Sequence, residues 1–406
     1  MCFLNQSFIK TRDNLLTVSR FGQQDKELKK LGANALKTSH LIYFKNSTHL
    51  KEIPAETIDL MVTSPPYPMI EMWDRVFSQQ NPAIRKALGK KDGNEAFELM
   101  HRELDKVWKE TLRVLKKGGF ACINMGDATR KIDSEFKLYA NHSRTLEYCL
   151  SLGLSPLPEI LWRKQTNAPN KFMGSGMLPA GAYVTLEHEH ILILRKGPKR
   201  EFRTSEEKLK RLQSAFFWEE RNVWFSDVWE DLKGTKQNNI NKKIRERSGA
   251  YPFDLPYRII NMFSLREDTV LDPFLGTGTT MAAAMATARN SIGFEIDTNF
   301  KDYLGERFQD VVAFSNKLIR SRMESHLSFV QSRERSRGPL GYSNKHYGFP
   351  VMTSQETEMI FDELDKLEVR DNGTIEVNYR QNPSFSFGDG KLREKNAAPL
   401  SKWIQA

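Results

Sequence analysis

The chain has 406 residues, of which 39% are hydrophobic and 28% are charged. This apolar content is enough for a sizeable core and excludes a chain that is disordered along most of its length. The 61 lysines and arginines outnumber the 51 aspartates and glutamates, so the formal net charge is +10, which favours a polyanionic partner such as nucleic acid.

The cysteines and the hydropathy of the sequence indicate the cellular compartment. Cys2, Cys122 and Cys149 are widely separated and form no CxxC motif, which argues against a disulfide framework and a structural zinc site. No apolar run reaches the roughly 20 residues of a membrane-spanning helix. Residues 1–10 also lack the apolar core of a signal peptide. We therefore expect a cytoplasmic protein with no membrane partner.

The predicted elements begin after a polar, basic N-terminal arm at residues 1–39. Short apolar runs at residues 41–44 and 58–63 are bounded by turn or breaker residues, which predicts two buried strands. Residues 95–115 carry apolar side chains at helical spacing, and the following Lys-Lys-Gly-Gly at 116–119 predicts that the helix ends there.

The next apolar runs, at residues 120–125 and 189–194, predict further buried strands. Strands that alternate with helices indicate an α/β fold with a parallel sheet covered by helices. Residues 310–406 continue beyond this pattern as a C-terminal extension. Within it, residues 357–367 predict a short helix, and the alternation at 374–379 predicts a strand.

A glycine turn at residues 269–280 joins a predicted strand to a helix of small residues. Gly276 and Gly278 permit the tight turn and let a ligand approach the backbone. The next strand ends at Glu295, where an acid accepts hydrogen bonds from ribose hydroxyls in dinucleotide folds. Met281 replaces the third glycine of the dinucleotide fingerprint, so adenosine without a pyrophosphate fits better than NAD or ATP, and a dehydrogenase is disfavoured. An ordinary strand–turn–helix is the alternative.

A proline-rich turn, Ser64-Pro65-Pro66-Tyr67, directly follows the strand predicted at 58–63. Ligands bind outside the carboxyl ends of strands in open α/β sheets, so this turn should face the same cleft as the glycine turn. The two prolines stiffen the chain and remove two donors, which leaves the Ser64 hydroxyl and backbone carbonyls to accept hydrogen bonds from an amino group. Tyr67 can stack on a planar base. A rigid proline turn without a ligand is the alternative.

Together the two motifs resemble the amino-methyltransferases that use S-adenosylmethionine to methylate N4 of cytosine or N6 of adenine in DNA. The resemblance covers residues 40–309 and implies a doubly wound, mostly parallel, Rossmann-like methyltransferase sheet. The catalytic turn precedes the cofactor loop, which is the circularly permuted order of the family's β class. The implied catalytic residues are Ser64, Pro65, Pro66 and Tyr67. The implied cofactor-binding residues are Asp272, Pro273, Phe274, Gly276, Gly278, Thr279, Thr280, Glu295 and Phe253.

The family pattern also bears on the target base. Serine at the position of Ser64 is commoner in the cytosine members and aspartate in the adenine members, so we expect cytosine N4, with adenine N6 as the alternative. No Pro-Cys pair exists, which disfavours a covalent cytosine-C5 mechanism. An RNA methyltransferase and a catalytically silent nucleic-acid-binding protein are less favoured readings. Asn46 departs from the family pattern, which often has an acid after the first strand.

The resemblance implies double-stranded DNA as partner, with the target base flipped out of the helix. It also suggests a partner restriction endonuclease, and it leaves the oligomeric state open. Residues 197–250, in which basic and aromatic side chains interleave, are the first candidate for target recognition, and a local core with a solvated face is the alternative. Residues 163–185 and 310–406 are further candidates.

Two smaller features adjoin these motifs. Trp73 and Asp74 follow the proline-rich turn and are candidates to line the target pocket, with core packing of Trp73 as the alternative. His188 and His190 share one face of a predicted strand. No third ligand is apparent in the sequence, so we expect no metal site.

Overall fold

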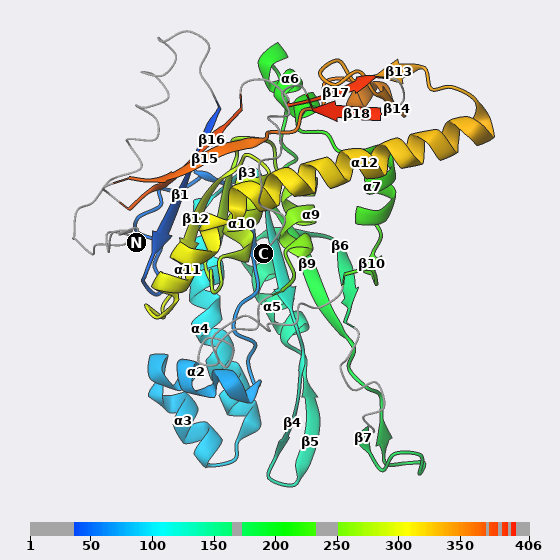
Figure 1. Ribbon diagram of the computed structural model, residues 1–406. Coiled ribbons are helices and arrows are strands. Elements are labelled where there is room, and N and C mark those ends of the chain that lie inside the picture. Colours follow the sequence, from blue (N-terminus) through cyan, green and yellow to red (C-terminus); the bar gives the residue numbers. More distant parts are fainter. Residues whose placement is uncertain are drawn as a thin grey trace, which may run out of the picture.

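The computed structural model describes residues 36–164, 173–232, 251–370, 373–380, 384–388 and 391–394. Its centre is a ten-stranded sheet in the order β10-β6-β9-β3-β2-β11-β12-β1-β16-β15 (Figure 1). The five middle strands all run parallel, which confirms the predicted parallel sheet. These strands are β3 (Leu115–Met125), β2 (Ile58–Thr63), β11 (Thr269–Asp272), β12 (Asn290–Phe294) and β1 (Lys37–Tyr43).

Antiparallel strands extend the sheet on both sides. On one side β9 is antiparallel to both β3 and β6, and the short β10 is parallel to β6. On the other side β16 is antiparallel to β1, and β15 is antiparallel to β16. The bounds are β6 (Leu154–Arg163), β9 (His188–Lys196), β10 (Val228–Trp229), β15 (Leu364–Val369) and β16 (Ile375–Tyr379). The expected C-terminal extension, residues 310–406, therefore supplies two strands of the central sheet.

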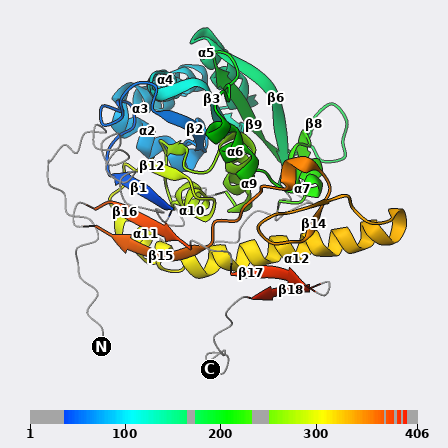
Figure 2. The same ribbon diagram turned by 90° about the horizontal axis from the view of Figure 1, so that it is seen from above.

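Helices cover both faces of the sheet (Figure 2). Side chains alternate along each strand, so Met61 faces one helical layer while its neighbours Leu60 and Val62 face the other. The layer against Met61 contains α4 (Gly93–Val114) and α5 (Asn141–Ser151). The opposite layer contains α9 (Asp254–Phe263) and α10 (Thr279–Ala286), with α11 (Phe300–Gln309) and α12 (Val311–Arg337) beyond them. This arrangement confirms the expected α/β fold with helices on both sides.

The helix α4 ends one residue before the end of the helix predicted at 95–115. It begins at the N-cap Asp92, whose side chain accepts a hydrogen bond from the backbone of Glu95, and it stops at Val114. The Lys-Lys-Gly-Gly segment belongs to β3 instead. A Cβ on Gly118 would lie 2.7 Å from the backbone nitrogen of Arg200, and one on Gly119 would lie 2.8 Å from a backbone oxygen of β2. The two glycines thus let neighbouring backbone approach β3 closely and do not cap the helix.

Smaller elements project from the two ends of the sheet (Figure 1). The short helices and two hairpins lie at one end, and α6 (Ser205–Gln213) lies at the other. The elements at the first end are α2 (Asp74–Gln80), α3 (Pro82–Gly89), β4 (Ala128–Ile132) paired with β5 (Glu135–Tyr139), and β7 (Met173–Gly174) paired with β8 (Ala182–Tyr183). In the described part of the chain, every helix is too short or too polar to cross a membrane.

Candidate functional site

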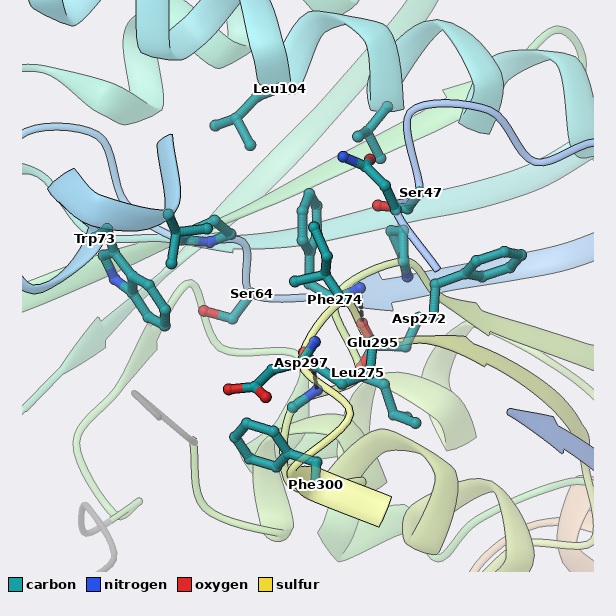
Figure 3. A pocket seen from close by; sticks show the side chains of 18 of the residues that line it. Ser47, Ser64, Trp73, Leu104, Asp272, Phe274, Leu275, Glu295, Asp297 and Phe300 are labelled. Atoms are coloured by element: carbon teal, nitrogen blue, oxygen red, sulfur yellow. Dashed lines mark hydrogen bonds between the residues drawn. The ribbon is translucent and has the colours of Figure 1, made fainter. Parts of the chain in front are cut away.

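A cavity of about 460 Å³ opens at the carboxyl ends of β2, β11 and β12. This volume lies within the usual range of small-molecule sites. Ser64, Phe274 and Glu295 converge on it from three different strand ends (Figure 3). The other walls come from the turn after β1, from the 3₁₀ turn at Glu71–Trp73 and α2, from α4, from the segment before α9 and from the segment after β12. They include Asn46, Ser47, Trp73, Leu104, Val107, Tyr251, Asp297 and Phe300. The two sequence motifs therefore meet at one cavity.

Asp272, the last residue of β11, organises the glycine turn. Its Oδ1 accepts hydrogen bonds from Thr63 Oγ1 at 2.6 Å and from the Phe274 backbone nitrogen at 3.1 Å. Its Oδ2 accepts a 2.6 Å hydrogen bond from Thr280 Oγ1, whose hydroxyl also contacts Tyr251. Burial raises the pKa of the Asp272 carboxyl. This buried acid thus ties the ends of β2 and β11 to the start of α10.

Glu295 is held at the cavity by the backbone of its neighbours. Its two carboxylate oxygens accept 2.8 Å hydrogen bonds from the backbone nitrogens of Gly276 and Asp297. Burial raises the pKa of Glu295 to about 7. Each oxygen has a second lone pair, so the carboxylate can also accept hydrogen bonds from ligand hydroxyl groups. Gly276 has a φ of 50°, which favours glycine where the turn wraps around this acid.

The predicted cofactor residues divide into two groups. Asp272, Pro273, Phe274, Gly276, Thr279 and Glu295 line the cavity. Thr280 instead holds Asp272 from behind. Gly278 has a φ of 75°, and a Cβ there would lie 2.6 Å from Leu304 of α11, so this glycine serves helix packing. Phe253 stacks on Tyr257 with ring centroids 5.4 Å apart and packs in the core, while the nearby Tyr251 is the cavity wall.

The proline-rich turn places its four residues in different surroundings. Ser64 and Pro66 line the cavity, and Pro65 is buried. The Tyr67 ring turns toward β3, where a Cβ on Gly126 would lie 2.6 Å from it. In this position the Tyr67 hydroxyl lies 2.8 Å from Ser64 Oγ. The turn therefore presents the serine to the cavity, while the Tyr67 ring lies outside the lining of this cavity, and its stacking on a target base stays a prediction.

A buried polar network continues from Tyr67 to β9. The Tyr67 hydroxyl donates to Glu189 Oε2 at 2.9 Å, and Lys164 Nζ contacts Glu189 Oε1. Asn124 Nδ2 donates to the Tyr67 oxygen at 2.8 Å and to Glu189 Oε2 at 2.6 Å. Burial and the nearby Glu189 carboxylate raise the pKa of Tyr67 well above its usual value. Sequence reasoning missed Asn124 and Glu189. Asn124 is a polar residue in an apolar run, which is the available signal, whereas Glu189 lies between two histidines at the start of β9 and carries no such signal.

The residues flanking the turn also differ in their roles. Trp73 lines the cavity, as one of the two sequence readings expected. Asp74 pairs with Arg130 instead, at 2.8 and 2.7 Å, which fixes the start of α2 to the β4–β5 hairpin. Asn46, where the family often has an acid, lines the cavity and accepts a 2.8 Å hydrogen bond from the Thr48 backbone nitrogen.

His190 has neighbours that the sequence did not reveal. Its ring stacks on His142 with centroids 3.6 Å apart, and His142 Nδ1 lies 2.8 Å from Asp127 Oδ2. These three side chains lie close enough to ligate one metal ion together, and His188 is not among them. A metal ion lies in the plane of the imidazole that binds it. Two rings stacked face to face would therefore have to turn before they could share an ion, and the stacked arrangement is not a formed metal site.

The first part of the expected recognition region, residues 197–250, lies far from the cavity. Because β9 is antiparallel to β3, its last residue Lys196 lies at the amino end of β3, where its ammonium donates to the Leu115 carbonyl at 2.7 Å. Arg200 pairs with Asp268, just before β11, at 2.6 Å. Figure 1 shows α6 at this end, opposite the two hairpins. Residues 197–214 therefore lie at the end of the sheet opposite the cavity, and their contact with DNA stays a prediction.

Part of the remaining described stretch, residues 215–232, packs as a local hydrophobic core. Phe217, Trp224 and Trp229 are buried, and Glu220 of α7 (Trp218–Trp224) pairs with Arg322 of α12 at 2.6 Å. These three aromatic side chains are therefore core residues, as the alternative interpretation of this region predicted. Residues 233–250 lie outside the described residues, as do residues 165–172 of the second candidate region and the arm at residues 1–35. The described part of that second region, β7–β8, projects at the cavity end (Figure 1).

The parallel sheet, the glycine turn after β11 and the acid after β12 define a Rossmann-like α/β protein. Comparison with known proteins narrows this class. The N6/N4 methylase family model, described as DNA methylase, matches residues 58–306. The chain belongs to this DNA methylase family.

Two relatives are similar over most of the chain. The type II methyltransferase M.MthZI of Methanothermobacter thermautotrophicus is 52% identical over 325 residues, which cover 80% of this chain and 90% of the relative. The type II methyltransferase M.MjaI of Methanocaldococcus jannaschii is 48% identical over 281 residues, which cover 66% and 91%.

A solved structure has a similar fold. It is a Thermus thermophilus protein described as a candidate DNA modification methylase, in complex with S-adenosyl-L-methionine. It is 28% identical to this chain, covers 67% of this chain and 95% of its own length, and has a TM-score of 0.52.

Proposed function

We propose that this protein transfers a methyl group from S-adenosylmethionine to the exocyclic N4 of cytosine in double-stranded DNA. The observation that carries the proposal is the position of the Ser64 hydroxyl, at a cavity that the glycine turn and Glu295 also line. A hydrogen-bond acceptor for an amino group and a nucleoside-binding acid thus open into one space. The type II methyltransferases among the relatives support DNA as the substrate class.

The residues at the cavity fit S-adenosylmethionine. When bound, this cofactor supplies an electrophilic methyl group on a sulfonium sulfur. Glu295 offers two carboxylate oxygens to the ribose hydroxyls, and the Phe274 ring supplies an apolar wall, packed edge to face on Trp108 at 6.0 Å. We assign to Tyr251, a cavity wall tied to Thr280, the part that the family resemblance implied for Phe253.

The proline-rich turn orients the target amine. The nitrogen of an exocyclic amine is a poor nucleophile because its lone pair is delocalised into the ring. Ser64 Oγ and the Pro65 carbonyl are the acceptors we assign to its two hydrogens, which favours a pyramidal nitrogen and aims the lone pair at the methyl group. Proximity and orientation are then the main sources of rate. The amine loses one proton on methylation, and the proposal needs no strong base beside it.

Serine at position 64 favours cytosine over adenine as the target base, by the family pattern. The base must leave the duplex to reach the cavity, at a cost of a few kcal/mol. The two hairpins and the α2–α3 pair project at the cavity end, and we assign DNA contacts to them in place of residues 197–214. We also propose that the protein works together with a restriction endonuclease and that it is located in the cytoplasm.

A nucleoside analysis of plasmid DNA tests the proposal. Plasmid from cells expressing the protein is digested to nucleosides and analysed by mass spectrometry, with plasmid from cells expressing Ser64→Ala as the matched control. We expect N4-methylcytosine with the unaltered protein and a sharp loss with the variant. N6-methyladenine in its place would assign the adenine reaction, and full activity of Ser64→Ala would remove Ser64 from the reaction. Absence of both modified nucleosides would refute the proposal.

A further inference from the structure

We propose that Glu189 is a positioning residue that acts through Tyr67 to turn the hydroxyl proton of Ser64 away from the cavity. Ser64 then offers only acceptor lone pairs to the target amine. The inference rests on the proposed function, because it concerns how Ser64 receives an amino group. It assigns a part in the reaction to a residue 122 positions from the tyrosine that it contacts and outside both sequence motifs.

The direction of each hydrogen bond follows from the donors available. The Glu189 carboxylate, paired with Lys164, only accepts, so the Tyr67 phenol proton lies on the 2.9 Å bond to Glu189. The phenol has no second proton for Ser64. The 2.8 Å contact between the two hydroxyls therefore requires Ser64 to donate its own proton to the Tyr67 oxygen. Both lone pairs of Ser64 Oγ remain as acceptors.

Asn124 reinforces this order. A carboxylate accepts only donors, so the amide of Asn124 must turn its nitrogen toward Glu189, at 2.6 Å. The same nitrogen donates to the Tyr67 oxygen at 2.8 Å, which fills the remaining lone pair of the phenol. Its distance to Ser64 Oγ is 3.5 Å, which is too long for a strong hydrogen bond. The raised pKa of Tyr67 keeps the phenol protonated and able to donate.

The direction matters because of the substrate. An exocyclic amine brings two N–H donors to the serine and the carbonyl beside it. A serine proton that pointed into the cavity would oppose these donors, or it would bind the nitrogen lone pair that must attack the methyl group. A network that holds the serine proton on the side away from the cavity prevents both effects before the base enters.

The substitution Glu189→Gln tests the proposal with little change in shape. A glutamine amide can donate to the Tyr67 oxygen, which frees the phenol proton to turn toward Ser64 and the serine proton to turn into the cavity. We expect the single-turnover rate of methyl transfer to unmethylated plasmid DNA to fall about 10- to 100-fold. The Kd for S-adenosylmethionine and for DNA should stay within about two-fold of the unaltered values. The matched control is Glu187→Gln. Glu187 directly precedes β9 and pairs with Arg163, so this variant should keep the methyl-transfer rate of the unaltered protein.

A double-mutant cycle separates positioning from a general structural role. Tyr67→Phe removes the hydroxyl through which Glu189 acts, and we expect it to lower the rate about as much as Glu189→Gln. The double variant should then lose no more than either single variant. Three results would each overturn the proposal. They are a rate in Glu189→Gln that is not lower than that of the unaltered protein, a further loss of equal size when Glu189→Gln is added to Tyr67→Phe, and a weaker cofactor affinity with an unchanged rate. Failure of the proposed function appears differently, as an unaltered protein that methylates neither base.

Discussion

The hydroxyl of Thr63 donates a 2.6 Å hydrogen bond to the buried carboxylate of Asp272. These residues end neighbouring strands, β2 and β11, and are 209 positions apart in the chain. Each is directly followed by one of the two site motifs. The bond therefore couples the proline-rich turn to the glycine turn through a side chain that is itself fixed by Thr280.

Removal of this bond should loosen both turns. We expect Thr63→Val, which keeps the side-chain shape, to lower the free energy of unfolding by about 1–3 kcal/mol, because Asp272 Oδ1 loses one of its two donors in a buried site. Urea unfolding measures this change. Thr57→Val is the matched control, since its hydroxyl bonds Pro54 in an exposed turn, and it should change the free energy by less than about 0.5 kcal/mol. Equal effects of the two substitutions would contradict the coupling.

Glu295 should make cofactor binding depend on pH. Its pKa is raised to about 7, so the carboxyl is largely protonated at pH 6 and largely ionised at pH 8. Ionised carboxylate is the better acceptor for ribose hydroxyls, so we expect affinity for S-adenosylmethionine to rise between these values. The cofactor amine also titrates near this range, so the quantity to measure by calorimetry is the affinity ratio of the unaltered protein to Glu295→Gln. A ratio that stays flat from pH 6 to 8 would contradict the assignment.

The same group affects stability in the opposite direction. The folded protein holds the Glu295 proton more tightly than the unfolded chain, whose carboxyl has its ordinary pKa of 4.5. The contribution of this group to stability therefore falls as the pH rises from about 4.5 to about 7. Glu295→Gln should lack this part of the pH dependence in unfolding measurements.

DNA affinity should depend on cations at the cavity end and not on those around α6. Arg75, an exposed residue of α2 at the cavity rim, should contact a phosphate, so Arg75→Ala should weaken binding and reduce the slope of log K against log salt by about 1. Lys208→Ala, an exposed cation on α6, should leave both quantities unchanged. Fluorescence anisotropy with duplex DNA at several salt concentrations measures them. Loss of affinity with Lys208→Ala would return residues 197–214 to the DNA interface.

The parts of the molecule that sequence predicted well are local in the chain. The strands at 58–63 and 374–379 follow from short apolar patterns between breakers, and the glycine turn carries its own signal. The helix predicted at 357–367 is wrong. This segment leaves a short 3₁₀ turn capped by Glu356 and enters β15, because pairing with β16 outweighs a weak helical preference.

The parts that sequence could not predict depend on contacts between distant segments. The surroundings of Tyr67 are one example, because Gly126, directly after β3, leaves room for its ring, and Glu189 on β9 accepts its hydroxyl proton. Neither partner has a local spacing that links it to the turn. The far position of α6 likewise follows from the antiparallel direction of β9, which no pattern within residues 197–250 encodes.

The pairing of β1 has a consequence for how the chain is made and shortened. This early strand lies between β12 and β16, whose residues emerge from the ribosome some 250 and 340 positions later. Until then both of its edges carry unpaired backbone groups, which is the condition under which strands join other chains. A truncation before residue 364 would leave one edge open permanently, so shortened versions of this protein should aggregate even where every residue of the cavity is retained.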